Sequence, residues 1–354
     1  MSSLSSVRLE DYIRLCIKPS DSLSSAIEII NETGYLACLV REPENNLLMG
    51  ILTDGDIRQS LLKGMKLDAS VAAVMNPSPL VVSPDISDSD ASRLMEINHF
   101  LHLPVVDSSG QLVGLYVASA LHVPSAHDEL LVIMAGGRGK RLMPLTSNCP
   151  KPMLPVNGRP ILHHILETVK SDGFINIAIS VNYLAEQITS YFGNGKDLGL
   201  SITYIRESHP LGTAGCLANL ASRDPQSFIV VINGDVITNV SLSDMLAYAK
   251  SNSLDGLMAV RTNEWQNPFG VVHVDGPKLV GLQEKPIYRH QVNAGIYVLS
   301  PKMLSLLRDE EYCDMTDLFE RAISSDLTLH VYPLHETWID IGRPSDYHSI
   351  NLIS

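Results

Sequence analysis

Met134-Ala-Gly-Gly-Arg-Gly-Lys-Arg-Leu142, which follows the apolar run Leu130-Leu-Val-Ile-Met134, is the stretch that most constrains the fold. A continuous apolar run of this length is typical of a strand buried on both faces of a parallel sheet. Three glycines directly after the strand let the backbone approach a ligand closely and turn its amides toward phosphate oxygens. The stretch therefore predicts an α/β domain with an anion-binding loop at the carboxyl end of a strand.

The rest of this carboxy-terminal half alternates between apolar runs and amphipathic patterns. Such alternation predicts a mostly parallel, Rossmann-like sheet covered by helices. We expect strands at 175–181, 201–205, 228–232 and 257–260, and helices at 161–170 and 184–192.

The amino-terminal part carries an internal repeat. Gly50–Ile57 and Gly114–Leu121 each follow a short apolar strand pattern, at 35–40 and 103–106, and each of these follows a helical pattern, at 24–31 and 87–98. With short extended pieces at 16–17 and 80–82, the order β-α-β-β-α occurs twice, and two such units are expected to bury a shared core. The polar segment 122–129 reads as a linker, so we predict two domains, 1–126 and 127–354.

Composition excludes several classes of function. The 354 residues carry a net charge of −13, which argues against a nucleic-acid partner because phosphate-backbone binding needs a basic face. The five cysteines form no C-x-x-C pair, which argues against a disulfide framework or a structural zinc site. A signal peptide and an 18-residue apolar run are both missing, so we expect a soluble cytoplasmic protein with no membrane partner.

The glycine loop differs from the two best-known phosphate motifs. Leu142 stands where a dinucleotide fingerprint needs its last glycine, and Arg141 stands where a Walker loop needs a hydroxyl. Four cations, Arg138, Lys140, Arg141 and Lys151, lie close together in this acidic chain, which favours an anionic ligand. The alternative is a surface turn with solvated charges.

Residues 130–354 resemble the sugar-phosphate nucleotidyltransferases, which have a Rossmann-like fold of the glycosyltransferase-A type. The resemblance rests on A-G-G-x-G-x-R-L from Ala135 and on Lys151-Pro-Met-Leu-Pro155. It implies that Lys151 pairs with the transferred phosphate, whereas Lys140 either contacts phosphate or faces solvent. Arg141 would stabilise the departing pyrophosphate or support the loop. The implied nucleotide phosphate site comprises Ala135, Gly136, Gly137, Arg138 and Gly139.

A second element, Glu207-Ser-His-Pro-Leu-Gly-Thr-Ala-Gly215, resembles the family segment that lies against the nucleobase and ribose. It implies nucleotide contacts from Glu207, Gly212 and Thr213, and its L-G-T-A-G wording resembles the guanylyl branch. Thr213 as a helix cap is a structural alternative.

Two carboxylates complete the expected catalytic centre. Asp235 ends the apolar run Phe228–Asn233, and Trp338-Ile-Asp340-Ile-Gly342 resembles the family's W-x-D-x-G element. Mg²⁺ prefers hard oxygen ligands, commonly one or two carboxylates with phosphate oxygens. We therefore expect Asp235 and Asp340 to hold Mg²⁺, the alternative for Asp235 being a turn or helix cap.

The resemblance also implies a site for a sugar 1-phosphate. Lys285 would neutralise the sugar phosphate, and the other expected contacts are Gly270, Glu284, Asn293 and Gly295. The implied reaction joins a hexose or hexosamine 1-phosphate to a nucleoside triphosphate, GTP by the wording of the base segment, and releases pyrophosphate. The product would be GDP-glucosamine for nonulosonic acid synthesis. Alternatives are a mannose-1-phosphate guanylyltransferase, a non-catalytic nucleotide sensor, or a glycosyltransferase, which would be expected to carry a D-x-D motif near Asp235.

The repeated amino-terminal unit resembles a pair of CBS domains. Thr53 and Asp56 fit the hydroxyl and carboxylate with which such modules grip a nucleotide ribose, whereas Val117 and Ala120 stand at the same places of the second copy. This implies one regulatory nucleotide, the alternative being a platform for assembly. CBS pairs often assemble face to face, so we expect a homo-oligomer.

Overall fold

The computed structural model describes residues 6–9, 11–98, 100–118, 126–221 and 227–350. The chain divides into two compact units, Met1–Ser125 and Ala126–Ser354, with the division one residue from the boundary expected from the sequence. Each unit is described by itself. Within the described ranges, no helix is both long and apolar enough to cross a bilayer.

The first copy of the amino-terminal repeat forms a three-stranded sheet in the order β2-β3-β4. Helix α1 packs its apolar face, which includes Leu23 and Ile27, on this sheet, and Ser22 caps the helix by accepting a hydrogen bond from the Ser25 amide at 3.1 Å. The elements are η1 (Tyr12–Leu15), β2 (Cys16–Ile17), α1 (Leu23–Thr33), β3 (Ala37–Arg41), β4 (Leu48–Thr53), α2 (Asp54–Leu62) and η2 (Val71–Ala73).

The second copy forms its own three-stranded sheet in the order β1-β6-β5, in which β1, from the start of the chain, pairs antiparallel with β6. The expected strand at 80–82 is reduced to a single bridge between Val82 and Val105, and the end of the repeat, including Ala120 and Leu121, lies outside the described residues. Side chains of both copies, among them Leu39 and Leu115, share one buried cluster, as the duplication predicted. The elements are β1 (Ser6–Leu9), α3 (Asp88–Asn98), β5 (His102–Val106) and β6 (Leu112–Ala118).

The carboxy-terminal unit is built on a seven-stranded sheet in the order β11-β10-β7-β12-β17-β14-β18. Strands β11, β10, β7 and β12 are mutually parallel, and β17 runs antiparallel to β12 and β14. The predicted mostly parallel α/β sheet is confirmed. The strands are β7 (Leu130–Met134), β10 (Asn176–Val181), β11 (Ser201–Arg206), β12 (Ile229–Asn233), β14 (Gly256–Gln266), β17 (Ile287–Leu299) and β18 (Leu329–Pro333).

Both faces of this sheet are buried, which explains the unbroken apolar run of β7. Leu131 and Ile133 pack in one cluster with helix α4, and Val132 packs on the opposite face with helix α10. The helices are α4 (Ile161–Ser171), α5 (Ala185–Phe192), α6 (Gly212–Gly215), α7 (Ala218–Ala221), α8 (Leu242–Ser251), α9 (Pro301–Leu304), α10 (Met315–Ser324) and α11 (Pro344–Ile350), with 3₁₀ turns η4 (Lys140–Leu142), η5 (Lys151–Met153) and η6 (Lys196–Leu198).

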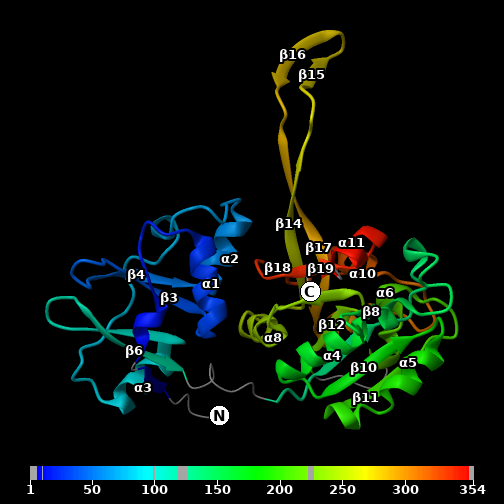
Figure 1. Cartoon of the computed structure of the whole chain (residues 1–354), viewed down its shortest axis with the longest axis horizontal. Coiled ribbons are helices and arrows are strands. Elements are labelled where there is room, and N and C mark those ends of the chain that lie inside the picture. The colour runs from blue at the N-terminus through cyan, green and yellow to red at the C-terminus, as the bar shows by residue number, and fades with distance from the viewer. Residues whose placement is uncertain (1–5, 10, 99, 119–125, 222–226, 351–354) are drawn as a thin grey trace. The chain divides into compact units, whose positions relative to one another are not determined.

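The sequence did not predict an arm formed by residues 261–292. Beyond the sheet, β14 and β17 continue as a two-stranded ribbon that ends in the hairpin of β15 (Val271–Asp275) and β16 (Lys278–Gln283) (Figure 1). Only its base, at 257–260, was expected as a strand. Two further short ladders pair β8 (Pro155–Val156) with β9 (Arg159–Pro160) and β13 (Val236–Thr238) with β19 (Trp338–Asp340).

Candidate functional site

The two predicted metal-binding aspartates lie together at the carboxyl end of β12. Strand β13 follows Asp235 and pairs antiparallel with β19, which places Val236 opposite Asp340. The Ile341 amide donates to the Asp235 carbonyl at 3.1 Å, so the two segments stay in register beyond the ladder. Because the residues are far apart in sequence, their juxtaposition depends on this small sheet.

Charges of both signs surround the two aspartates. Lys151, largely buried, forms an ion pair with the Asp235 carboxylate. Burial, followed by the neighbouring Asp235 carboxylate, raises the pKa of Asp340 above its ordinary value, and the cations Lys151 and Arg141 oppose the shift. Arg141 lies close to Asp340, and Gly342 packs between them. A side chain added at Gly342 would meet Arg141 Nη1 at 3.3 Å and Asp340 Oδ2 at 3.2 Å.

The chemistry of this centre fits a hard divalent cation. The Oδ1 atom of Asp340 is buried and has no hydrogen-bond partner, which is costly unless another group satisfies it. Among the described residues, no group of three or more His, Cys, Asp or Glu side chains is placed to hold a metal. Two carboxylates are a common protein contribution to a Mg²⁺ site, whose remaining ligands are water and substrate phosphate.

The glycine loop lies next to these aspartates. The Gly234 amide donates to the Met134 carbonyl at 2.9 Å, which ties the strand carrying Asp235 to the start of the loop. Gly139 has φ +60° and sits against Thr146 and Lys151, so a side chain there would meet both. The glycine thus brings the loop onto Lys151, the residue expected to pair with the transferred phosphate.

The other loop residues differ in exposure. Ala135, directly after β7, is buried, and Gly137 faces open space. Arg138 is exposed, with its guanidinium 6.0 Å from the centre of the Tyr183 ring. Lys140 is also exposed, which agrees with the solvent-facing alternative for its side chain.

Glu207, which directly follows β11, supports the glycine loop from the side. Its carboxylate accepts hydrogen bonds from the Ser180 hydroxyl and from the Leu211 amide, the latter at 3.1 Å. A side chain at Gly136 would come within 2.9 Å of Glu207 Oε1, so this glycine allows the loop to pack on Glu207. Both carboxylate oxygens already have partners within the chain.

The segment expected against the nucleobase is held by contacts within the protein. Gly212 has φ +80°, and a side chain there would collide with the Cys313 carbonyl at 2.5 Å. The Thr213 hydroxyl accepts from the Met315 amide at 2.8 Å and donates to Asp314 Oδ1 at 3.2 Å. Thr213 therefore joins α6 to the start of α10 and does not cap its own helix.

The predicted sugar-phosphate residues fall into two groups. Asn293 and Gly295 lie at the base of the arm, where the Gly295 amide donates to Asn293 Oδ1 at 2.9 Å. Gly295 also packs on Asn233, whose buried Oδ1 has no partner. The sequence reasoning missed Asn233, although its position at the end of a buried strand was a usable signal. Gly270, Glu284 and Lys285 lie farther out on the arm, and all three are exposed.

In the amino-terminal unit, Thr53 and Asp56 contact each other. The Thr53 hydroxyl donates to Asp56 Oδ2 at 2.6 Å, and the Asp56 amide donates back to the hydroxyl at 3.2 Å, which forms a capping box at the start of α2. A structural explanation therefore accounts for both residue types. At the corresponding positions of the second copy, Val117 is buried and Ala120 lies outside the described residues.

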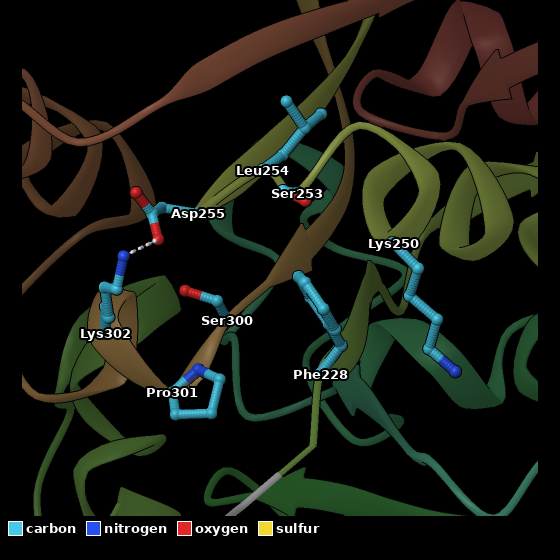
Figure 2. Close-up of a pocket in the computed structure, with 8 residues that line it drawn as sticks. All are labelled: Phe228, Lys250, Ser253, Leu254, Asp255, Ser300, Pro301 and Lys302. Carbon is cyan, nitrogen blue, oxygen red and sulfur yellow. Dashed lines mark ion pairs between the residues drawn. The ribbon is translucent and has the colours of Figure 1, made fainter.

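A pocket of about 420 Å³ lies at the amino ends of β12 and β14, opposite the end that carries the two aspartates. Its lining includes Phe228 before β12 and Asp255 before β14, and Figure 2 shows Lys302 directed toward Asp255, with a separation of 3.0 Å. Ligands of open α/β sheets bind beyond the carboxyl ends of the parallel strands, whereas Phe228 and Asp255 lie at the amino ends of β12 and β14. We therefore assign the candidate site to the edge of the sheet where Asp235 and Asp340 lie beside Lys151, which we call the aspartate edge.

Comparison with known proteins agrees with these assignments of fold. A mannose-1-phosphate guanylyltransferase from Mycobacterium tuberculosis is 33% identical over 229 residues, covering 63% of this chain and 64% of that protein. A UTP–glucose-1-phosphate uridylyltransferase from Synechocystis sp. is 30% identical over 235 residues, covering 61% of each. The chain thus spans less than two thirds of the length of either relative. The crystal structure of HddC from Yersinia pseudotuberculosis shares 25% identity and a TM-score of 0.50, covering 64% of this chain and 99% of that one.

Sequence models of two protein families also match segments of this chain. The CBS domain model matches residues 10–63 and 71–119, the two copies of the amino-terminal repeat. The Nucleotidyl transferase model matches residues 130–353, which include the glycine loop, both aspartates and the arm. The chain therefore belongs to the nucleotidyl transferase family, and two CBS domains precede its family segment.

Proposed function

We propose that this chain joins a sugar 1-phosphate to a nucleoside triphosphate, giving a nucleotide-sugar and pyrophosphate. The observation that carries the proposal is the edge where Asp235 and Asp340 meet Lys151 beside the glycine loop. A buried carboxylate oxygen without a partner, next to a second carboxylate and two cations, suits a site for a metal and phosphates. The similar transferases of other organisms support the same class of reaction.

The chemistry of this reaction needs no general base. The second pKa of a phosphate monoester lies near 6, so a sugar-phosphate oxygen is already ionised at neutral pH. This oxygen attacks the α-phosphorus in line with the bond to the departing pyrophosphate, forming one P–O bond as the other breaks. Positioning and charge stabilisation are then the main contributions of the protein.

The side chains of the edge divide these tasks. The glycine loop amides would hold the triphosphate, and Lys151 would neutralise the phosphate being transferred. Arg141, close to Asp340, would stabilise negative charge as pyrophosphate departs. Asp235 and Asp340 would hold Mg²⁺, which supplies positive charge to the phosphate oxygens when bound.

For the substrates we propose GTP and glucosamine 1-phosphate, with GDP-glucosamine for nonulosonic acid synthesis as the product. Mannose 1-phosphate is the alternative sugar, and the similarity to mannose-1-phosphate guanylyltransferases supports the guanine base with either sugar. Because another similar protein is a UTP–glucose-1-phosphate uridylyltransferase, UTP is the main alternative to GTP.

The test is a pyrophosphate-release assay with the full chain, Mg²⁺, five nucleotides and a panel of sugar 1-phosphates. We expect the highest kcat/KM with GTP, ahead of dTTP, UTP, CTP and ATP. A preference for another nucleotide would overturn the guanylyl assignment and leave the reaction class standing. Turnover with none of the pairs would overturn the reaction class.

For the amino-terminal unit we propose a regulatory nucleotide at Thr53 and Asp56. Their hydroxyl and carboxylate lie at a strand-to-helix turn and are both partly exposed. The competing role is assembly alone, and the capping box gives both residues a part in the fold that needs no nucleotide.

A further inference from the structure

The arm carries a pre-assembled cluster of polar groups at the junction between the ribbon and its terminal hairpin. A side chain added at Gly270 would lie 2.9 Å from Glu284 Oε2, so these two residues are in contact, and Lys285 follows directly. Lys285 has φ +44°, a conformation that constrains the backbone at this point. The cluster is therefore a defined feature of the arm, although it is exposed.

This cluster lies beyond the reach of the aspartates of its own chain. The two strands pair in continuous register from Val260 opposite Asn293 to Gln266 opposite Ile287. At about 3.3 Å per residue, the strand from Asn293 to Ile287 spans roughly 20 Å. Lys285 lies past the outer end of that strand, whereas Asn293 lies near the edge that carries the aspartates.

Side-chain pairs across the ribbon hold it extended. Trp265 stacks on Tyr288 with ring centres 5.8 Å apart, and Arg289 forms an ion pair with Glu264 at 2.6 Å. The pairing of β14 with β17 shifts register at its base, between Met258 and Val260, and the hairpin shifts between His273 and Val274. Folding the ribbon back along its length would break these pairs and the backbone ladder, so the arm is suited to reaching outward.

The terminal hairpin presents an apolar face to solvent. Val272 lies opposite Leu282 and Val274 lies opposite Leu279, so the four side chains share one face of the ribbon. Their exposed fractions are 53%, 71%, 63% and 56%. An isolated two-stranded hairpin is marginally stable in water, and a contiguous exposed apolar patch marks an interaction surface.

A surface of matching character lies beside the candidate site. Met143 and Leu145 follow the glycine loop, close in sequence to Arg141, and are 56% and 41% exposed. An apolar hairpin that covered them would bring the neighbouring Glu284 and Lys285 close to the glycine loop. The chain therefore carries both an arm and a surface suited to receive it.

We propose that the arm of one copy of this chain completes the active site of a second copy. The hairpin face would cover Met143 and Leu145 of that copy, and Glu284 and Lys285 would contact the sugar phosphate held at its two aspartates. The arm and the aspartates belong to one family segment, and the arm extends away from its own site, so the second copy is the occupant that the geometry favours. A two-fold axis would pair each arm with one site. This inference rests on the proposed function.

The decisive test is complementation between two full-length variants. Asp235→Asn impairs the aspartate edge and leaves the arm intact, whereas Lys285→Asn impairs the arm and leaves the edge intact. Asparagine suits the second position because it tolerates positive φ. We expect each variant alone to lose at least about 100-fold in turnover. After dissociation and random reassociation of a 1:1 mixture, we expect about a quarter of wild-type turnover, since half of the dimers are mixed and each has one intact site.

Other outcomes overturn the inference. No recovery of turnover, when differently tagged subunits co-purify as mixed dimers, would mean that each arm serves its own chain. Full activity of Lys285→Asn alone would remove the arm from the site. If wild type itself releases no pyrophosphate, the proposed function fails. The contact between the arm of one copy and the second copy is then tested by a measurement that does not depend on activity.

That measurement is photo-crosslinking. A benzophenone side chain placed at Leu282 in a mixture of unlabelled and ¹⁵N-labelled protein should yield peptides that join the two isotopes. We expect these to link the hairpin to the segment containing Met143. Crosslinks confined to a single isotope would show that the arm folds onto its own chain, and capture of other surfaces would place the hairpin elsewhere.

Discussion

The aspartate edge and the Thr53–Asp56 turn both carry motif residues at the ends of strands, but the polar atoms at the two places differ in their hydrogen-bond partners. Buried oxygens of Asp340 and Asn233 lack hydrogen-bond partners, whereas Thr53 and Asp56 satisfy each other in a capping box. A buried oxygen left unpaired is costly, and a ligand that binds there removes that cost. The edge therefore has properties that call for a ligand, and the turn has a sufficient structural role without one.

The largest expected effect is on turnover at the edge. Asp235→Asn and Asp340→Asn should each lower kcat by roughly 100- to 1,000-fold, corresponding to about 3–4 kcal/mol of transition-state stabilisation. Steady-state pyrophosphate release measures this, and circular dichroism checks the fold. Activity within a factor of two of wild type in either variant would remove that residue from the metal site.

The same two variants should change stability in opposite directions. Without added metal, the raised pKa of Asp340 means that its charged form costs stability in the folded state. This cost is absent below the ordinary carboxyl pKa of about 3.9 and grows as the pH rises through the raised value. Asp340→Asn should therefore unfold at a higher temperature than wild type at pH 7.5, with the difference disappearing near pH 3–4.

Asp235→Asn provides the matched comparison. It removes the partner of Lys151, whose side chain is only 11% exposed. We expect a loss of about 1–3 kcal/mol, between the values for exposed and fully buried ion pairs. Thermal unfolding in the presence of a chelator measures both variants. A loss of stability in Asp340→Asn at neutral pH would contradict the view that this carboxylate is held for a ligand.

Much of this edge was predictable because strand ends follow from local pattern. The apolar runs before Gly136 and Asp235 indicated buried parallel strands, and ligands bind at their carboxyl ends. The pairing of Val236 with Asp340 is a long-range contact, for which local periodicity carries no signal. The arm was missed for a related reason: its strands are exposed on both faces, so burial imposes no alternation, and each forms by pairing with the other.

Substitution of Thr213 is expected to have a smaller effect, because its hydroxyl already has hydrogen-bond partners within the protein. Thr213→Val should lower the free energy of unfolding by about 1–2 kcal/mol through loss of the bonds to Met315 and Asp314. Thr213→Ser, which keeps the hydroxyl, should stay close to wild type. The order of preference among nucleotides should be unchanged in both. A changed preference in Thr213→Val at unaltered stability would show that the hydroxyl contacts the nucleotide.

The smallest expected effect concerns Asp56 in the amino-terminal unit. If the turn binds a nucleotide, calorimetric titration with adenine and guanine nucleotides, with the catalytic site saturated, should show one binding event fewer in Asp56→Ala than in wild type. Residues 127–354 expressed alone should keep catalysis if the second unit is self-sufficient. Coupling of about 1 kcal/mol would change the affinity of the catalytic site for its substrate by roughly fivefold on nucleotide binding.

Asp56→Ala also removes a capping interaction, which by itself costs about 1 kcal/mol, so a matched control is needed. Ser22→Ala removes the cap of α1, where the hydroxyl accepts from the Ser25 amide, and no nucleotide contact is expected there. Loss of the binding event in Asp56→Ala alone would show that a capping box can also hold a ligand. Loss in both variants would trace the effect to stability. If wild type has no site beyond the catalytic one, Thr53 and Asp56 serve only the fold, and the assembly role stands.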